Sequence, residues 1–499
     1  MRFRRRLLPA LGLLAAAGAA AWFAHRAYYC SNAYRLGVER RLGEFFGLPV
    51  EVARIEPRGL SSRRLFEVTL WLPGRREPIF RCPKADWNQT RGTTVLVLDR
   101  PTMTIGSPRW QREDYRRVLR AGLGHDFAGL GIHRVDLRDA EVAWPREAFS
   151  IRAGGVDGTI RFDDRGDGRA ELAARSLNGV RTDGPIRIVA DIRPQEEEDL
   201  IPQVALDVPR LPLAALGLDG LVQSEVRQGW FEGRITVRQQ PGPDTIELSG
   251  RADGVRLEEW TARAPGGPVP ARLDLEVRQA EFHGGRLAGI TFTGKVAGLE
   301  VDALLRRFGW PAAGGRLDLE VFGAGLTSDG IEELRASGRW SGARCQALTE
   351  AWPALRGVEG DLTVRLNNLI VRGNRVARGD LDCDVRPAPD RGGTLDREAL
   401  RRLLRTHLGV DLPERMLPRA LEYTCLSARV LIEGESLRIL SGTGPAGPAL
   451  ITLRLLGRDI PLLPCVDHRL PVEPLVAGLR AQADRLREQL RGLRSRPAD

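Results

Sequence analysis

Polar and apolar residues alternate along most of the chain, which is the period of strands that bury one face. The clearest example is residues 272–277, with the sequence Arg-Leu-Asp-Leu-Glu-Val. The same six residues recur at 316–321, 44 positions later, and a looser version occupies 361–366. The spacing predicts antiparallel strands that return at a fixed interval.

A second motif has the same period. Three copies of the pattern [ST]-G-[RK]-x-x-G begin at Ser249, Thr293 and Ser337, each 44 residues apart. A segment of helical or loop character containing a tryptophan follows each copy. A fixed period of this length is typical of repeat architectures. The repeating unit is therefore predicted to be strand, turn, strand and short helix or loop.

The first glycine of each copy lies on the apolar side of its predicted strand. Gly294, for example, stands between Phe292 and Val296, and Gly250 and Gly338 hold the equivalent positions. Glycine weakens a strand unless the backbone bends or something approaches it closely. Two interpretations follow: a bulge that curves the sheet, or space for a ligand along a groove.

A groove would be lined by the apolar positions of the repeat. The sequence alone does not decide between an open channel and a filled core at these positions. The candidate lining residues are Leu248, Gly250, Leu273, Leu275, Val277, Phe292, Gly294, Val296, Leu317, Leu319, Val321 and Gly338.

The N-terminus combines arginines with an apolar run. Arg2, Arg4, Arg5 and Arg6 precede the run at 7–24. Arginines on this side keep the N-terminus in the cytoplasm, so the run is predicted to be an uncleaved, single-pass membrane anchor. The alternative is a cleaved signal peptide, since small residues at 19–21 resemble a cleavage site.

Further elements follow from local patterns. Helices are predicted at 33–46, 110–127, 395–408 and 412–423, and strands at 50–55, 65–72, 79–87, 93–98, 132–144, 428–440 and 449–456. Residues 472–494 predict a basic amphipathic helix with a stripe of leucines. That helix has three possible roles: capping the end of the sheet, lying on a membrane, or pairing with another helix.

Composition limits the possible functions. A chain of 499 residues exceeds one ordinary core, so several domains or repeats are expected. The net charge of +10 comes almost entirely from arginine, with Lys84 and Lys295 the two lysines, and acidic residues are interspersed throughout. This even mixing argues against nucleic acid as a partner.

Motifs for catalysis, cofactors and metals are missing from the sequence. The six cysteines form no CxxC pair, and the six histidines no H-E-x-x-H motif. The cysteines are either disulfide-bonded or buried free thiols. Residues 442–447 match G-x-G-x-x-G, but Pro445 and a following strand favour a hairpin loop over a cofactor site. The chain is therefore predicted not to be an enzyme, and to bind no cofactor or metal.

Three segments of the N-terminal region carry a family resemblance. They are Gly-Leu-Pro-Val-Glu-Val-Ala-Arg-Ile at 47–55, Leu-Phe-Glu-Val-Thr-Leu at 65–70 and Val-Leu-Val-Leu-Asp-Arg-Pro at 95–101. Together with the preceding helix and apolar run, they resemble the start of AsmA-like proteins. The resemblance implies a long, curved β-groove anchored in the inner membrane, a periplasmic body, and a role in outer-membrane biogenesis with phospholipid as the transported partner.

The expected fold is mainly β with some α: an N-terminal transmembrane helix followed by an elongated, curved antiparallel sheet. Its expected divisions are the anchor at 1–30, a helix and β region at 31–150, the repeating groove at 151–390, a helical insert with terminal strands at 391–469, and the helix at 470–499. The expected function is binding or transferring phospholipid between membranes. The alternative is a non-enzymatic envelope scaffold with a closed core, and other envelope proteins are possible partners.

Overall fold

The computed structural model describes residues 4–59, 61–75, 77–90, 93–105, 114, 117, 131–145, 150–163, 167–192, 203–217, 227–238, 245–262, 267–283, 286–307, 312–348, 357–387, 393–455, 457–463 and 467–471. The chain divides into two units. Unit 1 comprises Met1–Leu221, Phe231–Leu248 and Phe282–Arg286. Unit 2 comprises Val222–Trp230, Ser249–Glu281 and Leu287–Asp499.

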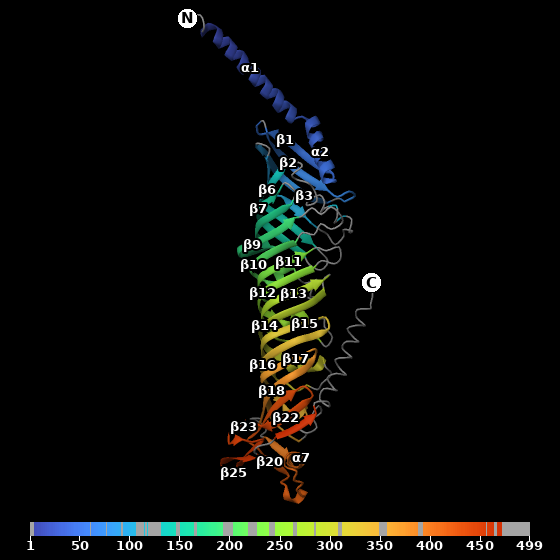
Figure 1. Ribbon diagram of the computed structural model, residues 1–499, viewed down its shortest axis with the longest axis vertical. Helices are drawn as coiled ribbons and strands as arrows, with labels where there is room; N and C mark the ends of the chain where they lie inside the picture. Colours follow the sequence, from blue (N-terminus) through green and yellow to red (C-terminus); the bar gives the residue numbers. More distant parts are fainter. Residues whose placement is uncertain are drawn as a thin grey trace. The chain divides into compact units, whose positions relative to one another are not determined.

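Unit 1 begins with two helices, α1 and α2, and continues in strands (Figure 1). No helix in the described ranges combines the length and the hydropathy needed to span a membrane. The elements of unit 1 are α1 (Arg4–Tyr29), α2 (Asn32–Phe46), β1 (Val50–Pro57), β2 (Ser62–Trp71), β3 (Pro78–Thr90), β4 (Thr93–Asp99), β5 (Thr102–Thr104), β6 (Ile132–Pro145), β7 (Ser150–Phe162), β8 (Gly168–Leu177), β9 (Val180–Ile192), β10 (Gln203–Pro212) and the 3₁₀ turn η1 (Leu213–Leu216).

Helix α2 confirms the helix predicted at 33–46. The Ser31 hydroxyl accepts a hydrogen bond from the Tyr34 N–H at 3.2 Å and so caps the N-terminus. Gly47, at φ 62°, ends the helix in the left-handed conformation. The Glu39 carboxylate accepts the Val52 N–H at 2.8 Å, which ties the helix to β1.

The strands of unit 1 form a long, mostly antiparallel sheet. β1, β2 and β3 pair in antiparallel order, and β6 to β10 continue in the same way. Between them, β4 and β5 both pair with β3 and run parallel to β6. The strands predicted at 50–55, 65–72, 79–87, 93–98 and 132–144 are confirmed as β1, β2, β3, β4 and β6.

Three strands divide their residues between the two units. They are β11 (Trp230–Arg238), β12 (Thr245–Arg256) and β13 (Arg272–His283). The remaining elements, which belong to unit 2 apart from the first residue of β14, are α5 (Leu257–Thr261), β14 (Arg286–Glu300), α6 (Val301–Arg307), β15 (Arg316–Thr327), β16 (Gly330–Arg344), η2 (Cys345–Leu348), β17 (Asp361–Arg372), β18 (Arg375–Arg386), β19 (Thr394–Asp396), α7 (Arg397–Leu408), η4 (Glu414–Met416), β20 (Ala420–Glu422), β21 (Cys425–Glu433), β22 (Ser436–Ser441), β23 (Thr443–Gly444), β24 (Gly447–Pro448), β25 (Ile451–Leu455), β26 (Arg458–Leu462) and β27 (Asp467–Pro471).

Unit 2 also contains a long antiparallel sheet. β14 to β18 pair in chain order, and β21 follows β18. The sheet then divides, because β21 pairs with β22 along most of its length and with β25 at its first two residues. β27 extends the first branch and β26 the second. The mainly β class is confirmed for both units.

The 44-residue repeat is visible in the placement of the short helices. α5, α6 and η2 begin at Leu257, Val301 and Cys345, at intervals of 44 residues. Each follows the second strand of a pair, so the repeating unit is strand, turn, strand and short helix. Ala303 of α6 is buried in a cluster with Val269, Ala271 and Leu299, and the partly buried Leu257 of α5 packs against the same cluster. The repeat predicted from the sequence is therefore a structural one.

Helix α7 confirms the helix predicted at 395–408. The Asp396 carboxylate caps it by accepting the Ala399 N–H at 2.6 Å. The helix predicted at 412–423 is wrong, since this segment forms the 3₁₀ turn η4 and strand β20. Pro413 and Pro418 explain the difference, because neither residue can donate the backbone hydrogen bond of a helix interior.

The predicted hairpin loop is confirmed, whereas two predicted helices cannot be compared with the structure. The loop at 442–447 is a hairpin, with β23 paired to β24, as its Pro445 indicated. The helices predicted at 110–127 and 472–494 lie outside the described residues, apart from Asp114 and Arg117.

The five described cysteines are free thiols, which favours buried thiols over disulfides. Burial raises the pKa of Cys82 and Cys345 to about 11. At pH 8 the reactive thiolate is then roughly a hundredfold scarcer than for an ordinary thiol. Alkylation followed by mass spectrometry should modify the exposed Cys30 long before Cys345. Equal rates at the two positions would contradict this packing.

Candidate functional site

One face of the unit 2 sheet carries apolar residues at one level across seven consecutive strands. Strand pairing places them directly opposite one another, from β14 to β22. This ladder consists of Val296, Leu319, Gly338, Leu366, Leu381, Val430 and Ile439. Neighbouring strands are about 4.8 Å apart, so six steps extend over roughly 29 Å.

Parallel rows flank the ladder on the same face. One row consists of Gly294, Val321, Ala336, Leu369, Gly379, Ile432 and Leu437. The other consists of Leu299, Leu317, Trp340, Val364, Cys383 and Ala428. The ladder and these two rows are called the apolar face below. Its continuity is a property of strand pairing, because side chains two residues apart share a face.

The apolar face is not fully covered by protein. Of the ladder side chains, only Val430 is buried, and Val296, Leu319, Leu366, Leu381 and Ile439 keep part of their surface exposed. In the flanking rows Leu317 and Ile432 are half-buried, whereas five members are buried: Leu299, Val321, Ala336, Val364 and Leu437. A sheet face of this kind still has apolar area to remove from water.

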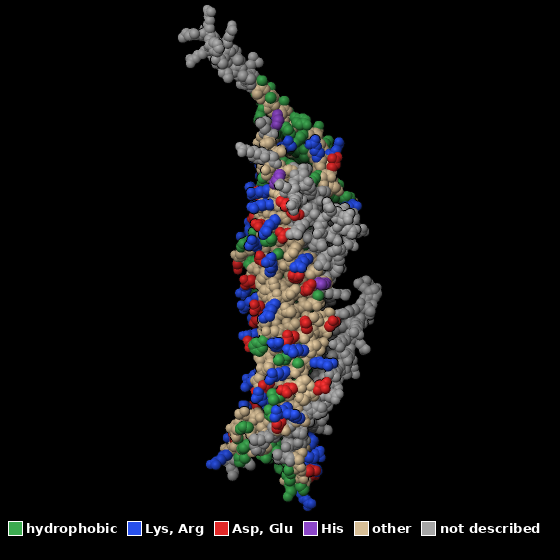
Figure 2. Space-filling model, in the orientation of Figure 1, with side chains coloured by type: hydrophobic (Ala, Val, Ile, Leu, Met, Phe, Trp, Pro, Cys, Tyr) green, Lys and Arg blue, Asp and Glu red, His purple; other side chains and the backbone are tan. Residues whose placement is uncertain are grey.

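The opposite face of the same strands is charged. Lys295, Glu320 and Arg365 point away from the ladder and are exposed. Arg429 binds Asp380 with two hydrogen bonds of 2.9 and 2.7 Å, and this pairing lowers the pKa of the carboxyl. Figure 2 shows basic and acidic side chains interspersed over the unit 2 strands. The two faces of the sheet are therefore chemically distinct.

The repeated glycines allow neighbouring strands to approach closely. A Cβ on Gly294 would lie 2.2 Å from the Asp274 carbonyl oxygen, and one on Gly338 would lie 2.3 Å from that of Asp318. The leucines after these aspartates, Leu275 and Leu319, occupy the space beside each glycine. Both glycines also adjoin register shifts. The geometry supports the bulge interpretation, since the glycines open no space for a ligand.

The last glycine of each motif has a separate role. Gly254 and Gly298 adopt φ values of 67° and 66°, a conformation that favours glycine. Their N–H groups donate to the carboxylates of Asp274 and Asp318 at 2.7 Å. These aspartates are the third residue of each Arg-Leu-Asp-Leu-Glu-Val strand. The two sequence motifs are thus the two halves of one repeated contact.

The structure brings several candidate lining residues together. Phe292, Val296 and Val321 pack in one cluster, and Val296 also meets Leu317 near α6. Leu273, Leu275 and Val277 are half-buried in β13. Leu248 is buried in β12 and belongs to unit 1, whereas Gly250 belongs to unit 2.

Four ladder residues were missed from the sequence. They are Leu366, Leu381, Val430 and Ile439. The looser repeat copy at 361–366 was a usable signal for the first of them. The other three depend on pairings that the 44-residue spacing does not predict.

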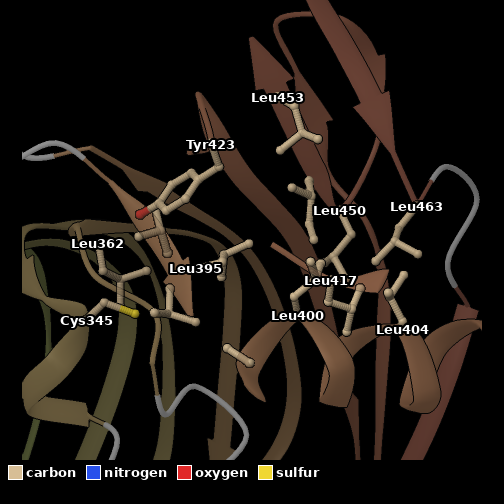
Figure 3. Packing of buried hydrophobic residues seen from close by; sticks show 14 of the residues in the cluster. Cys345, Leu362, Leu395, Leu400, Leu404, Leu417, Tyr423, Leu450, Leu453 and Leu463 are labelled. Carbon is tan, nitrogen blue, oxygen red and sulfur yellow. The ribbon is translucent and has the colours of Figure 1, made fainter. Parts of the chain in front are cut away.

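The strands of unit 2 end at a hydrophobic core around helix α7, which is called the closed end below. Leucines from helix α7 and the segments around it pack together (Figure 3), and Leu395, Leu400, Leu404, Leu417, Leu450 and Leu463 are buried. Leu395 has no exposed surface, and Leu400 and Leu404 of α7 pack with it. The buried Tyr423 hydroxyl donates to the Glu359 carbonyl oxygen. This closed end is a filled core, and the half-buried ladder residues Leu366 and Leu381 pack against it.

A hollow of about 550 Å³ lies over Gly323 and Gly325. Arg335 and Arg372 border it, and both contact the Glu333 carboxylate, at 2.9 and 3.6 Å. These guanidinium groups, Arg335 first, lower the pKa of Glu333. The hollow therefore offers a mixed polar surface.

Burial of apolar area is the chemistry that this arrangement supplies. Within the described ranges, no group of three His, Cys, Asp or Glu residues is placed to hold a metal ion. Burial also raises the pKa of the Cys383 thiol to about 12, so this thiol stays protonated beside the ladder. No family model, curated protein or solved structure matches the chain.

Proposed function

We propose that the apolar face of unit 2 binds the acyl chains of phospholipid and that the protein moves such lipids between membranes. The half-buried ladder across seven strands carries the proposal. Each methylene removed from water contributes about 0.8 kcal/mol, so an acyl chain lying across several strands gains substantial free energy. Such binding favours long apolar chains and requires no hydrogen bond to the ligand.

The N-terminal segment favours the inner membrane as the source of the lipid. In this proposal residues 7–24 anchor the chain in the inner membrane, with the N-terminus in the cytoplasm and the body in the periplasm. The resemblance of residues 47–55, 65–70 and 95–101 to AsmA-like proteins favours the same assignment. Phospholipid from that membrane would then be the ligand, and outer-membrane biogenesis the process served.

Site-specific cross-linking tests the proposal. A benzophenone amino acid is placed at Leu319, Leu366 or Leu381 of the full-length protein, which is then irradiated in cells. We expect phospholipid adducts at all three positions, detected by mass spectrometry of the purified protein.

The matched controls are the neighbouring residues Glu320 and Arg365, on the charged face of the same strands. They should give no lipid adduct. Adducts at similar yield on both faces would indicate non-specific contact with membranes. An absence of lipid adducts at all three ladder positions would reject the proposal.

A scaffold with a closed core is the second candidate, and the closed end around α7 favours it. If protein covers the ladder as it covers Leu395, the same cross-linkers should form protein adducts in place of lipid adducts. The experiment therefore separates the two functions in one measurement.

A further inference from the structure

We propose that the loop after α7 docks unit 2 onto an anionic membrane surface. This loop, residues 409–419, is called the α7 tip. It exposes two large apolar side chains, with Met416 70% and Val410 41% accessible. Figure 1 shows the α7 region projecting beyond the strands of unit 2. Apolar side chains at a projecting end are suited to insertion at a bilayer interface.

The exposure of Met416 is a fixed feature of the fold. The next residue, Leu417, is buried in the closed end with Leu400 and Leu404 of α7. The Leu417 N–H also donates to the Glu414 carbonyl oxygen at 3.2 Å, which closes the η4 turn. Met416 is consequently held on the outside by a neighbour that is anchored inside.

The charge of the α7 tip selects the membrane. The α7 tip itself contains two arginines and two carboxylates, and together with helix α7 the segment 397–419 contains six arginines and three carboxylates, a net charge of +3. The carboxylates of Asp411 and Glu414 lie 2.7 and 3.8 Å from Arg401. Arg415 and Arg419 are exposed beside the apolar side chains. Basic residues next to an inserted apolar side chain favour an anionic lipid surface.

A membrane fits this surface better than a protein partner. The apolar side chains of the α7 tip are exposed, and a flat bilayer interface can accept them without a complementary pocket. The inference concerns membrane contact alone and is independent of lipid binding at the ladder. Failure of one proposal leaves the other to its own test.

A fluorescent label tests the docking. Met416→Cys is introduced into the full-length chain with Cys30→Ser and Cys465→Ser, and is labelled with a polarity-sensitive dye. Vesicles of phosphatidylcholine, with or without phosphatidylglycerol, are then added. We expect a blue shift with the anionic vesicles that weakens as salt screens the arginines.

The matched control is Phe322→Cys in the same background, since Phe322 is 57% exposed in β15. It should show no shift. An unchanged spectrum at position 416, which docking to a protein would also produce, would overturn the proposal. Equal shifts at 416 and 322 would overturn it as well.

Charge reversal gives a second readout. Arg415→Glu with Arg419→Glu, in the labelled Met416→Cys chain, should raise the anionic lipid concentration at half-maximal shift at least about tenfold. Arg365→Glu, on an exposed position of β17, should leave it unchanged. A thermal melt of each variant confirms that it is folded. An unaltered titration in the double reversal would contradict the assigned role of the arginines.

Discussion

Replacing Gly294 or Gly338 with alanine should destabilise unit 2 by about 3 kcal/mol, at the upper end of the range for overpacking. The added Cβ would lie 2.2 or 2.3 Å from a backbone carbonyl oxygen of the adjoining strand. A backbone atom cannot move away as a flexible side chain can, so the strands must separate locally. Gly294 carries an extra penalty because its φ of 152° disfavours a side chain.

Urea denaturation followed by circular dichroism measures this loss. The matched control is Gly323→Ala in β15, where an added Cβ meets nothing within 4 Å. That substitution should be neutral or slightly stabilising, because alanine restricts the unfolded chain more than glycine does. If the alanine variants at 294 and 338 were as stable as the control, the close approach of the strands would be refuted.

The glycines show which features of the repeat could be predicted from the sequence and which could not. Their apolar-side position and their 44-residue period are local patterns, and they correctly predicted the repeating unit. The same patterns left two explanations for the glycines open. The choice depended on the carbonyl oxygens of Asp274 and Asp318, which belong to the preceding strand and have no signature near the glycine itself.

The ladder was only partly predictable for a related reason. Leu319 and its repeat partners follow from alternation, but register fixes which residues stand opposite them. Leu381 pairs with Val430, 49 residues away, across the insertion that contains α7. Bulges shift the register further, as between Leu366 and Asn368. The 44-residue period therefore does not predict which residues pair, because the insertion and the bulges change the register.

Local pattern also misled at 412–423. Leu417 and Leu421 have the spacing of a helix face, but Pro413 and Pro418 remove backbone donors that a helix requires. The result is the α7 tip, whose Leu417 is buried and whose Met416 is exposed. The misprediction and the proposed docking surface thus have one cause.

Replacing Leu395 with alanine should cost about 3 kcal/mol of unfolding free energy, since burial of this side chain is complete. Leu395 pairs with Val358 in an isolated bridge and packs in the closed end beside Leu417 (Figure 3). The surrounding side chains come from several separate segments, so they cannot all collapse into the resulting cavity. Urea denaturation provides the measurement, with Val410→Ala as the exposed control, expected to change stability by less than about 0.5 kcal/mol.

The Leu395→Ala variant also tests whether the closed end takes part in lipid binding or only stabilises the fold. Leu395 is not part of the ladder, and Leu319 does not pack against the cluster that contains Leu395, so folded Leu395→Ala protein should still form lipid adducts through a cross-linker at Leu319. Loss of stability with adducts retained would show that the closed end acts as a structural stop for the sheet. Loss of the adducts in protein that circular dichroism shows to be folded would mean that acyl chains extend under α7, and the assigned boundary of the apolar face would then be wrong.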